Sequence, residues 1–146
     1  MIEEIWIITS WGIPLFYLEV GKDQTQLPDE NLDKSTLLGG FWSAINVFVK
    51  NIGADAINSV QFGAFQFVIK KSLHNLLFIA KTPLKMKDKK VKEVLDKIVK
   101  SFCERFPTAE ENVDGNTDQF LPFLDVANKI ILDTYATNFQ NGLSAI

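Results

Sequence analysis

The chain has 146 residues, a length that fits one domain and can bury a core without disulfides or structural metals. Hydrophobic residues make up 47% of it and charged residues 23%, which excludes a disordered chain, and a net charge of −3 argues against nucleic-acid binding. The single cysteine, Cys103, excludes an internal disulfide and a two-cysteine metal site.

Two apolar runs near the N-terminus predict a β-hairpin. Residues 5–9 are mostly β-branched or aromatic, residues 13–20 repeat this composition, and Gly12 separates the two runs. Both runs are almost continuously apolar, so we expect strands that are covered on both faces of a sheet. No signal peptide and no run of ~20 apolar residues is present, which predicts a cytoplasmic protein without a transmembrane segment.

A helix is expected from about residue 35 to residue 52, after a polar loop over residues 21–33. Ser35 or Thr36 can cap its start, and Gly53 is a usual signal for a helix end. Apolar residues recur at helical spacing and cover a broad arc of this helix: Leu38, Phe41, Trp42, Ile45, Phe48, Val49 and Ile52.

Three further strands are expected over residues 57–62, 65–70 and 76–80, because apolar residues alternate in the first two and are continuous in the third. A helix over residues 87–106 carries a clear apolar stripe, and Pro107 ends it. Thr117 can cap a last helix whose start Pro122 is expected to delay or kink. We expect one domain over residues 1–133 and a C-terminal tail of uncertain order over residues 134–146.

The resulting order, β-β-α-β-β-β-α-α, predicts an α/β fold with one helix on one face of a five-stranded sheet and two on the other. Residues 5–8, the run Trp11-Gly12-Ile13-Pro14 with the three residues after it, and residues 40–48 resemble the first hairpin and first helix of the longin domain. The resemblance spans nearly the whole chain and implies a profilin/longin-like, mainly antiparallel sheet of order 2-1-5-4-3. The related roadblock fold begins with a helix before its first hairpin, which makes longin the preferred interpretation and roadblock the alternative.

Resemblance to this family implies a non-catalytic role in binding other proteins. Longin-like proteins serve in vesicle trafficking, and several form platforms that bind or regulate small GTPases. Their third strand lies at a sheet edge and, with the first helix, often forms a dimer or partner surface. The residues here that match such a surface are Ser43, Asn46, Val47, Lys50, Ile57, Asn58, Ser59 and Gln61. An ordinary solvated surface is the alternative interpretation of these residues.

A run of lysines before and within the second predicted helix is the other candidate contact surface. Its members are Lys85, Lys87, Lys89, Lys90 and Lys92. Such a run fits contact with an anionic membrane or an acidic partner, which would make the chain a peripheral membrane adaptor, or it is a solvated helix end.

No residue pattern predicts a catalytic, cofactor-binding or metal-binding site. His74 is expected in a solvated turn and Cys103 in a buried, inert position. No glycine-rich phosphate-binding motif occurs, so the chain is not expected to bind GTP itself. The sequence therefore favours a homodimer or heteromeric scaffold, with a small GTPase as a candidate partner, over an enzyme.

Overall fold

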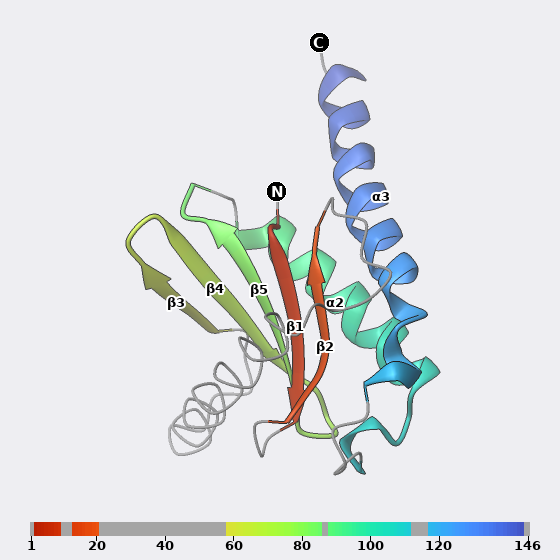
Figure 1. The fold of residues 1–146 in the computed structure, drawn as a ribbon. Coiled ribbons are helices and arrows are strands. Elements are labelled where there is room, and N and C mark those ends of the chain that lie inside the picture. The colour runs from red at the N-terminus through yellow and green to blue at the C-terminus, as the bar shows by residue number, and fades with distance from the viewer. Residues whose placement is uncertain (1, 10–12, 21–57, 86–87, 112–116, 145–146) are drawn as a thin grey trace.

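The structure is a computed structural model that describes residues 2–9, 13–20, 58–85, 88–111 and 117–144 (Figure 1). The helix predicted over residues 35–52 lies outside the described residues.

Five strands form one sheet in the order β2-β1-β5-β4-β3, and every neighbouring pair is antiparallel. The strands are β1 (Glu4–Thr9), β2 (Pro14–Glu19), β3 (Asn58–Phe62), β4 (Phe65–Lys71) and β5 (Leu76–Pro83). The predicted α/β class with an antiparallel sheet is confirmed. β1 and β5 lie at the centre of the sheet, while β2 and β3 are its edges.

Cross-strand register places apolar side chains on both faces of the central strands. On one face Ile5 lies opposite Leu18, and on the other Trp6 lies opposite both Tyr17 and Ile79. The register between β1 and β2 shifts between Ile7 and Ile8, at the end of the pair where Pro14 begins β2. A proline at that position removes a backbone donor where a ladder bond is least needed.

Two α-helices cover one face of the sheet, α2 (Asp88–Arg105) and α3 (Phe123–Ser144), as Figure 1 shows. Between them lie two short 3₁₀ helices, η1 (Ala109–Glu111) and η2 (Asp118–Phe120). The predicted delay at Pro122 is confirmed, since α3 begins at the next residue. Thr117 precedes η2 and makes no side-chain capping hydrogen bond, so its predicted role as a cap is wrong.

The last helix continues through the boundary expected between residues 133 and 134. Thr134 is buried, and its hydroxyl donates to the carbonyl of Ile130 and accepts from Lys97 Nζ of α2 at 3.0 Å. Tyr135 packs against the main core. α3 runs from Phe123 to Ser144 without a break at the expected boundary.

The main core lies between the sheet and the two helices, and phenylalanine rings form its centre. Phe102 of α2 is fully buried, and its ring centroid lies 5.1–5.8 Å from those of Phe78, Phe120 and Phe123. Phe106 adds a ring 5.0 Å from Phe102. One side chain thus joins the sheet, α2, η2 and α3.

We expect Phe102→Ala to lower the free energy of unfolding by about 3–5 kcal/mol, because it leaves a cavity where four ring contacts meet. Urea denaturation followed by circular dichroism measures this loss. The matched control is Leu132→Ala, since Leu132 of α3 is 55% exposed and its loss should change the free energy by less than about 0.5 kcal/mol. Equal losses in both variants would contradict this assignment of the core.

Candidate interaction surface

Strand β3 is an edge strand, and among the described strands it pairs only with β4. Ser59 and Gln61 of β3, two residues of the predicted partner surface, are exposed. Asn58 lies opposite Ile69 in the register, at the start of the strand. The other residues predicted for this surface, Ser43, Asn46, Val47, Lys50 and Ile57, lie outside the described residues.

The two edges of the sheet differ in how they resist pairing with another strand. Edge strands are usually protected by lysine, proline or a bulge. β2 has Pro14 and the shift of register beside Ile8. The sequence of β3, Asn-Ser-Val-Gln-Phe, contains no lysine or proline, and its register with β4 is regular. Of the two edges, β3 is therefore the better suited to accept a further strand.

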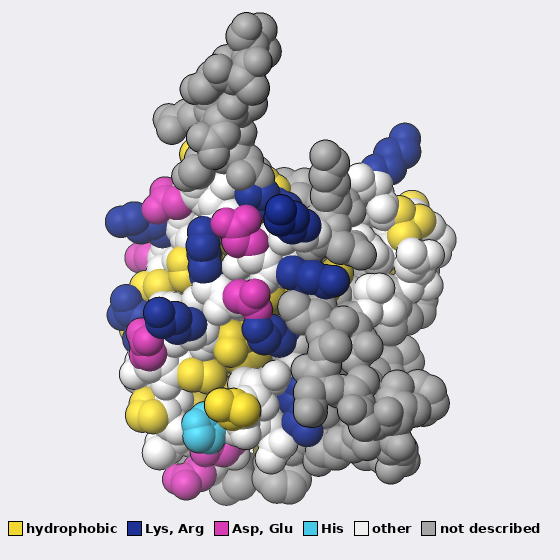
Figure 2. All heavy atoms as spheres, turned by 180° about the vertical axis from the view of Figure 1, so that it is seen from behind, with side chains coloured by type: hydrophobic (Ala, Val, Ile, Leu, Met, Phe, Trp, Pro, Cys, Tyr) yellow, Lys and Arg dark blue, Asp and Glu magenta, His cyan; other side chains and the backbone are white. Residues whose placement is uncertain are grey.

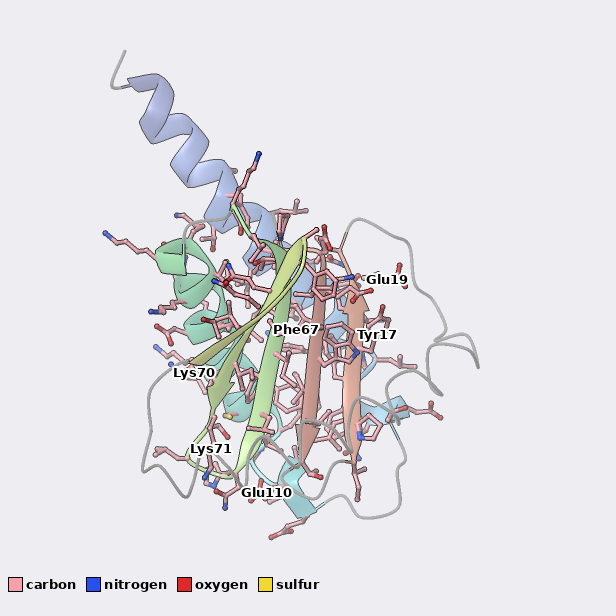
Figure 3. The ribbon with its side chains drawn as sticks, turned by 90° about the vertical axis from the view of Figure 1, so that its left-hand side faces the viewer. Tyr17, Glu19, Phe67, Lys70, Lys71 and Glu110 are labelled. Atoms are coloured by element: carbon pink, nitrogen blue, oxygen red, sulfur yellow. The ribbon has the colours of Figure 1, made fainter. Side chains whose placement is uncertain are left out.

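The face of the sheet opposite α2 and α3 is also apolar and buried. Its cluster consists of Trp6, Ile8, Tyr17, Phe67, Ile69, Leu77 and Ile79, with Phe65 packed against it. The Trp6 ring lies 5.2 Å from the Tyr17 ring and 5.8 Å from the Phe67 ring. Figure 3 views this face, with Tyr17 and Phe67 labelled on it. The sheet thus has apolar side chains on both faces, as the continuous apolar runs predict.

A hydrogen-bonded polar group borders this second cluster. Glu4 and Glu19 lie directly opposite each other on β1 and β2, an arrangement in which like charges destabilise a sheet. The Tyr17 hydroxyl lies 2.9 Å from Glu4 Oε1 and 3.1 Å from Glu19 Oε1, and donates its one hydrogen to this pair. Lys81 Nζ lies 3.9 Å from Glu4 Oε2 and offsets part of the negative charge.

Burial raises the pKa of Tyr17 far above its usual range, and the hydrogen bonds and charges of Glu4 and then Glu19 raise it further. The phenol therefore stays protonated and acts as a donor. Lys81 also lies over the Phe65 ring, 4.7 Å from its centroid, and close to Glu3. The group holds the ends of three strands together and is best explained as structural.

The predicted lysine run divides into two kinds of residue. Lys85, Lys89 and Lys92 are exposed, whereas Lys90 is partly buried and donates to Glu93 Oε2 at 3.1 Å. Lys87 lies outside the described residues. Figure 2 shows the molecule from behind the view of Figure 1, and on this face lysine and arginine side chains are spread widely, with fewer acidic side chains between them.

His74 lies in the turn between β4 and β5, as predicted, and is exposed. Its Nδ1 is 3.9 Å from Glu110 Oε1 of η1. The same turn exposes the whole of the Leu73 side chain.

Cys103 is only partly buried, so the prediction of a buried cysteine is wrong in degree. Burial nonetheless raises the pKa of its thiol, although a hydrogen bond with Ser72 lowers this pKa in part. The raised pKa disfavours the reactive thiolate.

Sequence reasoning missed the group around Tyr17 and the exposed Leu84, which precedes the lysines. Both features depend on tertiary structure. Tyr17 and Glu4, for example, are thirteen positions apart in the sequence and meet only through strand register. Within the described residues, no group of three or more histidine, cysteine or acidic side chains could hold a metal ion, and no helix has the length and hydropathy needed to cross a membrane.

No protein-family model matches the sequence, and no curated protein matches it. Among solved structures, MglB of Myxococcus xanthus is similar, with 14% identity, a TM-score of 0.49, and coverage of 70% of this chain and 85% of that chain. The gliding protein MglB of Thermus thermophilus is 18% identical, with a TM-score of 0.41 and coverage of 75% of each chain.

We expect Tyr17→Phe to lower the free energy of unfolding by about 1–3 kcal/mol at neutral pH, because two facing carboxylates lose a donor. In the unfolded chain tyrosine ionises near pH 10.0, and in the folded chain only above that value. The stability that this difference contributes is complete below pH 10 and is lost as the pH rises further.

Urea denaturation at neutral pH and at about pH 11 tests both effects. The fall in stability on going to the higher pH should be smaller in Tyr17→Phe than in the natural chain. Tyr17→Phe should still lose some stability at the higher pH, because burial also raises the pKa of Tyr135. If both proteins lose the same stability above pH 10, the Tyr17 phenol is not held in its protonated form by this group.

Proposed function

We propose that this chain is a protein-interaction module of the longin type that binds partners through strand β3 and acts without covalent chemistry. In the complete domain, the helix expected over residues 35–52 would cover the second apolar face. The domain would then have three layers, with one helix opposite α2 and α3. The partner is a second copy of the chain or a subunit of a heteromeric scaffold.

The observation that carries the proposal is the position and composition of β3. It is an edge of the sheet, and its exposed side chains, Ser59 and Gln61, are uncharged. An edge of this kind offers backbone donors and acceptors to an incoming strand, which supply affinity while neighbouring side chains supply specificity. Uncharged residues also suit the centre of an interface, where charged residues are depleted.

A small GTPase is the partner class that the longin-like resemblance of the sequence supports. The strand order β2-β1-β5-β4-β3 agrees with the order that this resemblance implies. The residues suggested for such a contact are those of β3 and the predicted first helix. A roadblock-like dimer that regulates a GTPase would use the same edge and is the alternative within this class.

We expect Ser59→Lys/Gln61→Lys to weaken self-association by about tenfold or more, because lysines on paired edges would face one another. Sedimentation equilibrium over a range of concentrations measures the dissociation constant. The free energy of unfolding should stay within about 0.5 kcal/mol of that of the natural chain, since both positions are exposed.

A control variant adds a lysine outside the sheet, at Gln119, which is exposed in η2. Gln119→Lys should leave self-association unchanged. If the natural chain is a monomer at every concentration, pairing between two copies is excluded, and only a heteromeric partner remains. If Gln119→Lys weakens association as much as the β3 variant, the interface lies elsewhere.

A second experiment addresses the GTPase. Small GTPases from the same source, loaded with a fluorescent guanine nucleotide, would be mixed with the natural chain and with Ser59→Lys/Gln61→Lys. We expect the natural chain to change the rate of nucleotide release or hydrolysis and the variant to do so less. Unchanged rates with every GTPase tested, together with no binding to any of them, would overturn this part of the proposal.

A further inference from the structure

An exposed leucine lies beside the lysines at the connection from β5 to α2. Leu84 is 38% exposed, and Lys85 next to it is exposed. The backbone N–H of Leu84 donates to the carbonyl of Ala64 at 3.4 Å, which ties this connection to the turn between β3 and β4. Leu84 therefore lies in a turn that is tied to the β3–β4 turn, four residues before the start of α2 at Asp88.

Lys89 and Lys92 extend the positive charge along α2. They are three residues apart, so they lie on the same side of the helix, and both are exposed. With Glu93 and Asp96 they line a shallow hollow of about 510 Å³. Lysines in the first turns of a helix face the positive end of the helix dipole, which makes this position unfavourable for α2 alone.

The two acidic residues of this hollow are already paired with other lysines. Glu93 binds Lys90 at 3.1 Å and Lys97 at 3.4 Å, and Asp96 binds Lys70 of β4. The hydrogen bond from Lys90 holds the pKa of Glu93 below its usual value, so this carboxylate stays ionised and paired. Within the described part of the chain, no ion pair engages Lys85, Lys89 or Lys92, and their charges face solvent.

We propose that Leu84, Lys85, Lys89 and Lys92 form a docking surface for a membrane that contains anionic lipids. The three lysines contact lipid headgroups, and the Leu84 side chain enters the boundary between headgroups and acyl chains. This surface goes beyond the proposed pairing through β3, because it uses different residues and a different partner.

A lipid surface fits this composition better than an acidic protein or a nucleic acid. Lysines act as point charges on flexible stems, which suits headgroups that have no fixed geometry. Fixed phosphate or carboxylate groups are more often recognised by arginine, and the only arginine of the chain, Arg105, lies at the far end of α2. A bilayer can also bury the exposed Leu84 side chain at the boundary between headgroups and acyl chains.

Co-sedimentation with vesicles of phosphatidylserine and phosphatidylcholine, compared with vesicles of phosphatidylcholine alone, tests this surface. We expect binding only to the anionic vesicles, decreasing as salt is added. Each lysine near such a surface contributes about a fivefold gain in affinity, so Lys89→Glu/Lys92→Glu should lose roughly 25-fold or more. Leu84→Ser should lose several-fold.

Each variant has a matched control that makes the same chemical change elsewhere. Lys100→Glu/Lys129→Glu alters the net charge equally at two other exposed lysines, and Leu132→Ser removes another exposed leucine. Both controls should bind anionic vesicles nearly as well as the natural chain. Circular dichroism verifies folding, and the lysine variants test the surface even if Leu84→Ser proves unstable.

Three outcomes would overturn the proposal. Equal binding to neutral and anionic vesicles would show that charge is not recognised. An equal loss in Lys100→Glu/Lys129→Glu would show that only net charge matters. Binding to polyglutamate or duplex DNA with none to anionic vesicles would assign the lysines to an acidic macromolecule. Because all these variants retain Ser59 and Gln61, self-association measured in parallel reports separately on β3.

Discussion

Burial of the central strands on both faces is the constraint on which the rest of this structure depends. In β1, Ile5 and Ile7 face the helical layer while Trp6 and Ile8 belong to the opposite cluster, and all four are buried. A strand of this kind is stable only when each face of its sheet is covered. Surfaces for binding are then left mainly at the strand edges and on the outer sides of helices.

Elements whose identity depends on side-chain pattern alone were predictable from the sequence. The apolar stripe of α2, including Val91, Leu95 and Phe102, predicted a helix within a residue or so of the observed bounds. The end of α3 was not predictable in this way. Thr134 is a poor helix former, and it is held in place by Lys97 of α2, a contact that no local pattern reveals.

The candidate surfaces show the same division. Lys85, Lys89 and Lys92 stand out in the sequence, and the pairing of Glu93 with Lys90 and Lys97 follows from their spacing of three and four residues within α2. The pairing of Asp96 with Lys70 of β4 depends on how α2 packs against the sheet, which no local pattern reveals. The pairing of Glu4 with Glu19 depends on strand register, and a shift of one residue would place them on opposite faces. Sequence periodicity predicts which residues of a strand share a face, but it does not predict which residues of the neighbouring strand they pair with.

The two proposed surfaces meet at one point, since the turn that follows β3 binds the backbone of Leu84 through Ala64. This proximity has a geometric consequence. Identical edge strands that pair around a twofold axis normally run antiparallel, which places the corresponding ends of the two copies far apart. In a homodimer formed through β3 the twofold axis would stand perpendicular to the shared sheet, so the two Leu84 residues would lie at opposite ends while the α2 helices of both copies cover the same face. Lys89 and Lys92 of both copies would then lie on the same side of the dimer, so docking on a membrane is compatible with pairing through β3 to a second copy as well as to a different protein.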